Sequence, residues 1–221
     1  MKKTPANLVR LAMLFAVALV VSNVVTAKTV DTHIPFLTST LSFPGAVFCY
    51  AVTFLATDVV GELWGKKEAQ TIVWTGLVCQ VLACLIIVLT GLLPAADAGV
   101  QDAYDVLLGQ NAIFVTASLC GYALSQSADV AIFHRVRAWA LSKFGEGRKM
   151  RWLWNNVSTM TAQALDTVVF IAIAFGVGSG WLFDPSMWPT LAGMMVGQYL
   201  VKLALAALDT PLFWLLTREK S

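Results

Sequence analysis

Apolar residues along the chain gather in long unbroken runs, separated by short polar or turn-forming segments. An α-helix rises about 1.5 Å per residue, so about 20 apolar residues cross a hydrocarbon core of about 30 Å. Continuous runs favour helices, because membrane strands alternate apolar and polar positions. The pattern predicts an all-α polytopic membrane protein, with a single transmembrane domain over residues 1–221. Its six transmembrane helices are expected at residues 8–27, 44–64, 71–93, 112–134, 155–175 and 187–216.

The composition agrees with a membrane protein and excludes several other classes. Hydrophobic residues make up 58% of the 221 positions, charged residues make up 13%, and the mean hydropathy is +0.73. A net charge of +2 is too small to indicate binding of nucleic acid. The four cysteines lie inside apolar runs without a CxxC pair, and no GxxxxGK[ST] phosphate-binding loop occurs. We therefore expect no metal site, no cofactor and no ATP hydrolysis by such a loop.

The lysines and arginines indicate the orientation in the membrane. Of the 15 basic residues, all except Lys28 and Lys202 lie at the N-terminus, at the C-terminus or in alternate connections. The connections at residues 94–111 and 176–186 contain acidic residues but no lysine or arginine. Cytoplasmic loops are the ones enriched in basic residues, so both termini are expected in the cytoplasm.

Ionisable residues inside the predicted spans are functional candidates, because an unpaired charge in hydrocarbon costs several kcal/mol. Asp166 and Lys202 are the deepest of them, and Lys202 is expected to pair with Asp166 or Asp129 when the site is empty. Five carboxylates face one lysine, so either some of them carry protons or a cationic ligand neutralises them. The ionisable residues are Asp58, Glu62, Asp129, Asp166, Lys202 and Asp209.

Helical spacing aligns these groups with amides and aromatic rings, since residues three and four apart share one side of a helix. Amides and carboxylates beside aromatic rings suit a flat, hydrogen-bonding heterocycle. Polar contacts that hold helices together are the alternative interpretation. The pattern Gln-x-x-Asp-x-x-x-Phe occurs twice. The four stripes are Tyr122, Gln126, Asp129 and Phe133; Thr159, Gln163, Asp166 and Phe170; Gln198, Lys202 and Asp209; and Tyr50, Phe54, Asp58 and Glu62.

Two pairs of small residues would allow helices to approach closely. They are Gly193-x-x-x-Gly197 and Ala12-x-x-x-Ala16. Packing within the chain is the favoured interpretation. A homodimer seam and a docking face for another membrane subunit are the alternatives.

Short motifs in a characteristic order carry a family resemblance over nearly the whole chain. They are Ser22-Asn23, Phe43-Pro44, Asp58-x-x-x-Glu62, Ser125-Gln126-x-x-Asp129, Asn155-Asn156, Gln163-x-x-Asp166, Lys202 and Asp209-Thr210-Pro211. With these motifs the chain resembles the queuosine precursor transporter family, also known as the VUT-type vitamin uptake transporters. The resemblance implies a bacterial inner-membrane protein that imports 7-cyano-7-deazaguanine or 7-aminomethyl-7-deazaguanine for queuosine modification of tRNA.

The implied substrate agrees with the polar stripes. A guanine-like edge presents adjacent N–H donors and a carbonyl acceptor, which suit carboxylates such as Asp166 or Asp129 and amides such as Gln126 or Gln163. The full set of candidate substrate-binding residues is Asn23, Asp58, Glu62, Gln126, Asp129, Phe133, Asn156, Gln163, Asp166, Phe170, Gln198 and Lys202.

Three functions compete at this point. The leading hypothesis is a stand-alone secondary transporter in the lipid bilayer, with helices that expose the ligand alternately to the two sides. The second is a substrate-capture subunit of an energy-coupling-factor transporter; such subunits also have six helices, and they need separate ATPase and coupling subunits. The third is an intramembrane hydrolase with paired aspartates, but no GxGD or GxSG motif is present, so we do not expect an enzyme.

Overall fold

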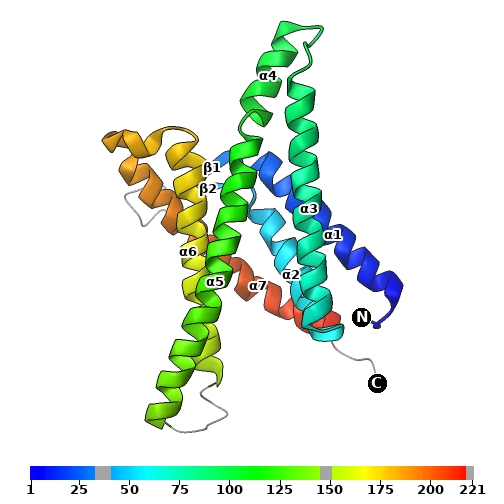
Figure 1. The fold of residues 1–221 in the computed structure, drawn as a ribbon, viewed down its shortest axis with the longest axis vertical. Helices are drawn as coiled ribbons and strands as arrows, with labels where there is room; N and C mark the ends of the chain where they lie inside the picture. The colour runs from blue at the N-terminus through cyan, green and yellow to red at the C-terminus, as the bar shows by residue number, and fades with distance from the viewer. Residues whose placement is uncertain (33–40, 145–150, 218–221) are drawn as a thin grey trace. The chain divides into compact units, whose positions relative to one another are not determined.

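The computed structural model describes residues 1–32, 41–144 and 151–217, which are mostly helical (Figure 1). A π-helical turn, η2 (Ala172–Val177), extends α6, and the 3-10 turns η3 (Trp181–Phe183) and η4 (Pro185–Met187) precede α7. The expected all-α membrane fold is confirmed. The helices are α1 (Pro5–Val25), α2 (Val47–Leu63), α3 (Lys66–Gly91), α4 (Ala98–Leu108), α5 (Asn111–Phe144), α6 (Arg151–Ile171) and α7 (Trp188–Thr217).

Five helical segments within the described residues are long and apolar enough to cross a membrane. Each run that the sequence predicts as a span overlaps one helix, namely α1, α2, α3, α5, α6 with η2, or α7. The shortest is α2, whose 17 residues extend about 26 Å, a little less than the hydrocarbon core.

Two helical segments go beyond the sequence-based expectation. The short helix α4 lies in the connection at residues 94–111, where no helix is expected. Helix α5 does not end near residue 134 but continues to Phe144. The segment after residue 134 contains good helix formers and neither glycine nor proline, so nothing stops the helix there. With 34 residues, α5 is about 51 Å long and extends beyond a single membrane crossing.

A small hairpin joins α1 to α2. Strands β1 (Thr29–Thr32) and β2 (Leu41–Pro44) pair in antiparallel fashion, with Val30 opposite Phe43. The Gly45 N–H closes the hairpin by donating to the Lys28 carbonyl at 2.7 Å. A Cβ atom on Gly45 would lie 2.9 Å from that carbonyl oxygen, so the close approach requires glycine.

The chain forms two compact units. The first unit comprises residues 1–115 and 192–221, and the second unit comprises residues 116–191. The core of the first unit lies between α1, α2 and α3, and Phe213 and Leu216 of α7 pack against it. Its buried members are Leu11, Phe15, Ala56, Val59, Val60 and Ile72.

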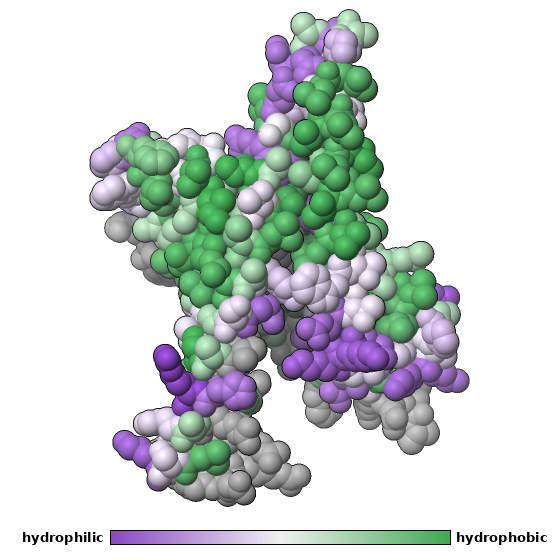
Figure 2. All heavy atoms as spheres, in the orientation of Figure 1, coloured by the Kyte–Doolittle hydropathy of each residue, from purple (hydrophilic) through white to green (hydrophobic). Residues whose placement is uncertain are grey.

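The outer faces of these helices are apolar as well. Figure 2 shows apolar residues over the visible face of α3, with polar residues near its N-terminal end. Val78, Leu82 and Leu85 of α3 are all more than half exposed. An exposed apolar surface of this extent is what a helix presents to lipid tails.

Helix α3 packs closely on α1 at Gly76. A Cβ atom on Gly76 would lie 2.9 Å from Cδ1 of Phe15, nearer still to Cε1 of that ring, and 3.2 Å from Cδ2 of Leu19. Gly76 belongs to a buried stripe on α3 together with Ile72 and Gln80, at steps of four residues. The missing side chain is what allows the two helices to approach, because lipid offers little hydrophobic force to hold them together.

Gly76→Ala is therefore expected to destabilise the protein by about 1–3 kcal/mol relative to Gly193→Ala, because the new methyl group overlaps the Phe15 ring. Gly193 also lies inside a helix, and a Cβ atom there meets nothing within 4 Å. Both variants gain the same helix propensity from alanine, so their difference reports packing alone. Melting temperatures of the detergent-purified variants measure it. Equal melting temperatures would show that α1 and α3 do not depend on this contact.

Candidate functional site

Lys202 is the most deeply buried ionisable side chain that the structure describes in the first unit. It is 5% exposed, and its Nζ lies 5.4 Å from the centre of the Tyr50 ring on α2. The Tyr50 ring stacks on that of Phe54, with centroids 6.3 Å apart. The negative face of an aromatic ring attracts a cation, and the attraction grows when both groups are removed from water. The ring thus stabilises an ammonium group that hydrocarbon alone would not accommodate.

Gln198 lies one turn before Lys202 on α7. It is 2% exposed, and neither Nε2 nor Oε1 has a hydrogen-bond partner among the described residues. Asn23, near the end of α1, is also buried, and its Nδ2 has no partner in the same part of the chain. A buried amide without a partner costs about 1–3 kcal/mol. Groups of this kind are ready to bond a ligand or an ordered water.

In the second unit, Asp166 lies directly against α5. A Cβ atom on Gly121 would come within 2.9 Å of Asp166 Oδ1 and 3.3 Å of the Asp166 carbonyl oxygen. Gly121 is flanked at steps of four by Ala117 and Ser125, and all three are buried. This stripe of small residues brings α5 and α6 together and sets the position of the carboxylate.

The stripe that the sequence predicts on α6 gathers around Asp166. Phe170 is buried, while Gln163 and Asp166 are half-buried. The Gln163 carbonyl accepts a hydrogen bond from the Thr167 hydroxyl at 2.9 Å. Its side-chain Oε1 is buried without a partner among the described residues. An acceptor, a carboxylate and an aromatic ring therefore follow one another along one side of α6.

The other candidates differ in their surroundings. Gln126, Asp58 and Glu62 are exposed, and Phe133 is half-buried. The side chains of Asp129, Asn156 and Asp209 lie outside the described residues. The expected pairing of Lys202 with Asp166 or Asp129 joins residues of different units, and it stays a prediction.

A family model decides where the chain belongs. The model is described as "Putative vitamin uptake transporter" and matches residues 44–216. The chain belongs to this family. Membership makes it a multi-pass membrane transporter and not an enzyme, and the resemblance found in its motifs is confirmed. Asn23 precedes the matched range, whereas the other candidate residues lie inside it.

Two relatives of this chain carry a more specific description. The chain is 31% identical over 197 residues to the "Probable queuosine precursor transporter" of Bacillus subtilis (strain 168), which covers 88% of this chain and 77% of the relative. It is 29% identical over 131 residues to the "Queuosine precursor transporter" of Escherichia coli (strain K12), over 58% of this chain and 53% of the relative. No solved structure matches it significantly.

Two buried amides are not among the site residues predicted from the sequence. Gln80 of α3 has an unpartnered Oε1, and Asn111 at the start of α5 has an unpartnered Oδ1 and Nδ2, counting partners among the described residues. The signal for Gln80 is its place four residues after Gly76, on the side of α3 that packs against α1. Gln80 carries no charge and belongs to none of the repeated motifs.

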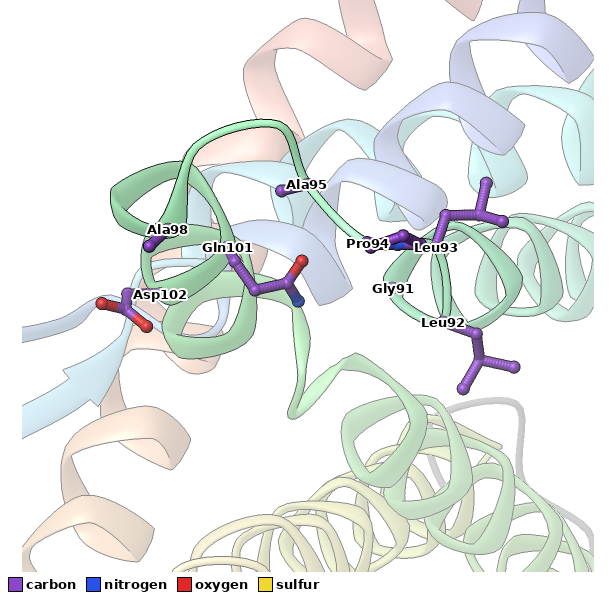
Figure 3. Close-up of a pocket in the computed structure, with 8 residues that line it drawn as sticks. All are labelled: Gly91, Leu92, Leu93, Pro94, Ala95, Ala98, Gln101 and Asp102. Carbon is purple, nitrogen blue, oxygen red and sulfur yellow. The ribbon is translucent and has the colours of Figure 1, made fainter.

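Among the described residues, neither a surface hollow nor a group of metal-ligating side chains adds to the candidate site. An open hollow where α3 meets α4 includes Gln101 and Asp102 but none of the candidate residues (Figure 3). Tyr104 of α4 closes this corner, since its hydroxyl donates to the Ile87 carbonyl at 2.6 Å. In the described ranges, no three His, Cys, Asp or Glu side chains are placed to hold a metal ion.

In this transporter, Gly121→Ala is expected to displace the Asp166 carboxylate and to cost about 1–3 kcal/mol of stability. In an Asp166→Ala background the same change should cost less, because the clash with Oδ1 disappears. A double-mutant cycle of the four proteins, measured by thermal unfolding in detergent, gives the coupling. Additive effects of the two substitutions would mean that Gly121 does not position the carboxylate.

Proposed function

We propose that this transporter imports the queuosine precursors 7-cyano-7-deazaguanine and 7-aminomethyl-7-deazaguanine across the bacterial inner membrane, for modification of tRNA. The observation that carries the proposal is the 31% identity, over 88% of the chain, to a relative named as a queuosine precursor transporter. The second relative bears the same description in another bacterium.

The buried polar groups support a ligand of this chemistry. The guanine-like edge of a deazaguanine offers N–H donors beside a carbonyl acceptor. Within the second unit, Asp166 and the Oε1 of Gln163 can accept from such donors, and the Phe170 ring provides an apolar face. Within the first unit, the amide of Gln198 can both donate and accept, and the Tyr50 ring provides an apolar face for a flat heterocycle. The full candidate set from the sequence, including Asp129 and Asn156, belongs to the same proposal.

The proposed orientation places both termini in the cytoplasm. The amino group of Met1 donates to the Leu216 carbonyl, so the start of α1 and the end of α7 lie together within the first unit (Figure 1). Ends on the same side of a membrane require an even number of crossings, which supports α2 as a sixth span beside the five longer ones. Lys66 and Lys67 begin α3 at the end where these termini lie, as the positive-inside rule requires.

For the mode of transport we propose a secondary transporter. Gln198 and Lys202, which are buried within α7, support this mode, because polar and ionisable residues inside membrane helices mark the substrate pathways of transporters. The mechanism then needs the ligand, the lipid bilayer and a coupling ion, but no other protein. A need for energy-coupling subunits would appear in the proteoliposome experiment below.

Complementation in cells tests the substrate. A bacterium that lacks both precursor synthesis and its own importer is expected to regain queuosine in tRNA, at low external precursor, when it expresses this chain. Asp166→Asn should restore little, because the neutral amide replaces one acceptor oxygen with a donor. The queuosine content of digested tRNA, measured by mass spectrometry, is the readout.

Asp102→Asn serves as the matched control, since Asp102 is exposed on α4 and belongs to no candidate group. It should restore queuosine as well as the wild type does. Membrane abundance of each protein is measured in parallel by immunoblot. A wild-type protein that is abundant in the membrane but restores no queuosine would overturn the proposed substrates.

Proteoliposomes test the mode of transport. The purified protein alone is expected to concentrate radiolabelled 7-cyano-7-deazaguanine inside vesicles when an ion gradient is imposed, because a secondary transporter needs no other subunit. Vesicles without protein give the background. Binding without accumulation, together with uptake that appears only after ATPase and coupling subunits are added, would establish the energy-coupling-factor alternative.

A further inference from the structure

Gln80 is a buried amide in the middle of α3 that the candidate set does not include. The side chain is 2% exposed, and its Oε1 has no hydrogen-bond partner within the described parts of the chain. Hydrocarbon cannot replace the lost hydrogen bonds of such a group, so its burial needs a partner.

The packing of α1 on α3 shows what lies beside Gln80. Leu11 and Ile72 share the core, and Gly76 meets Phe15 and Leu19 one turn further along. Helices α1 and α3 are therefore parallel, and a step of four residues along one corresponds to a step of four residues along the other. One more turn, about 6 Å, leads from Gly76 to Gln80 and from Leu19 to Asn23.

Asn23 is thus the α1 residue at the level of Gln80. It is 3% exposed, and its Nδ2 has no partner among the described residues. One helix presents an unsatisfied donor, and its neighbour presents an unsatisfied acceptor at the same depth. Two such groups together cost about 2–6 kcal/mol when nothing bonds them.

Tyr50 of α2 belongs to the same level. Helices α1 and α2 are antiparallel, because the hairpin joins them and Phe15 and Ala56 share the core. The Gly45 N–H donates to the Lys28 carbonyl where the two helices are joined, and Asn23 and Tyr50 each lie five residues from this hydrogen bond. Lys202 of α7 lies with its ammonium group over the Tyr50 ring. Four helices of the first unit therefore bring polar or aromatic groups to one depth.

We propose that Asn23 and Gln80 recognise the hydrogen-bonding edge of the transported heterocycle. Asn23 Nδ2 donates to a carbonyl or ring acceptor of the ligand, and Gln80 Oε1 accepts from the neighbouring ligand N–H. In a deazaguanine these are the adjacent carbonyl and ring N–H of the six-membered ring, and the Tyr50 ring supplies an apolar face beside them. The inference rests on the proposed function and adds Gln80 as a specificity-determining residue.

A purely structural role makes a different prediction. Two amides that only hold α1 to α3 would contribute to stability and leave ligand affinity unchanged. Two amides that await a ligand contribute little to the empty protein, so their removal should leave its stability unchanged or raise it.

The test uses the full-length protein purified in detergent and titrated calorimetrically with 7-cyano-7-deazaguanine. Gln80→Met keeps the length of the side chain and removes both polar atoms. We expect its Kd to rise at least tenfold, with the melting temperature of the empty protein unchanged or higher. Gln70→Met is the matched control, because Gln70 is exposed in the first turns of the same helix. It should bind as the wild type does.

The outcomes separate this inference from the proposed function. If the wild type binds neither deazaguanine, the proposed function fails. If the wild type binds and Gln80→Met binds equally well, or melts lower with unchanged affinity, Gln80 does not recognise the ligand. Should Gln80→Met not fold, Asn23→Leu tests the same edge from α1, with the same tenfold loss expected. If neither variant folds, the amides hold the helices together and the inference is wrong.

Discussion

Every polar side chain inside a membrane must find its hydrogen bonds within the protein, and this constraint separates two kinds of residue here. The hydroxyls of Thr26, Thr57 and Thr167 donate to carbonyls four residues earlier in their own helices. They are satisfied locally and need no ligand. Side-chain amides present two donors and an acceptor, which one helix does not satisfy. Those that keep a buried atom without a partner among the described residues are Asn23, Gln80, Asn111, Gln163 and Gln198.

Close helix packing determines where these groups lie. Gly76 lets α3 approach α1 and brings Gln80 to the level of Asn23, while Gly121 lets α5 approach α6 and holds the Asp166 carboxylate. In both cases the glycine lies one turn or less from the level of a polar side chain. Lipid provides little drive for helices to associate, so shape decides which faces meet. The same contacts that stabilise each unit therefore position its polar groups.

Much of the fold could be predicted from the sequence, because bilayer thickness fixes the length of a membrane helix. The hairpin and α4 could not, since both are shorter than a span and lie in connections. A small-residue pair alone does not mark a close contact: a Cβ atom on Gly193 would meet nothing within 4 Å, whereas Ala12 packs against the core and the glycines that let helices approach are Gly76 and Gly121. Spacing identifies a possible face, but only the neighbouring helix decides whether that face is used. For the same reason the stripe around Asp166 is covered, whereas Gln126 is exposed.

The Lys202 ammonium adds an electrostatic condition on the proposed substrates. It lies 5.4 Å from the centre of the Tyr50 ring, at the level of the amides that are proposed to read the ligand. A second positive charge about 5 Å away would be repelled by about 3 kcal/mol at an effective dielectric constant of about 20. The neutral cyano group meets no such repulsion, whereas an aminomethyl group must point away from Lys202 or be compensated by a carboxylate. Under the proposed function, a cationic precursor beside the Lys202 ammonium therefore needs a carboxylate that a neutral precursor with the same hydrogen-bonding edge does not need.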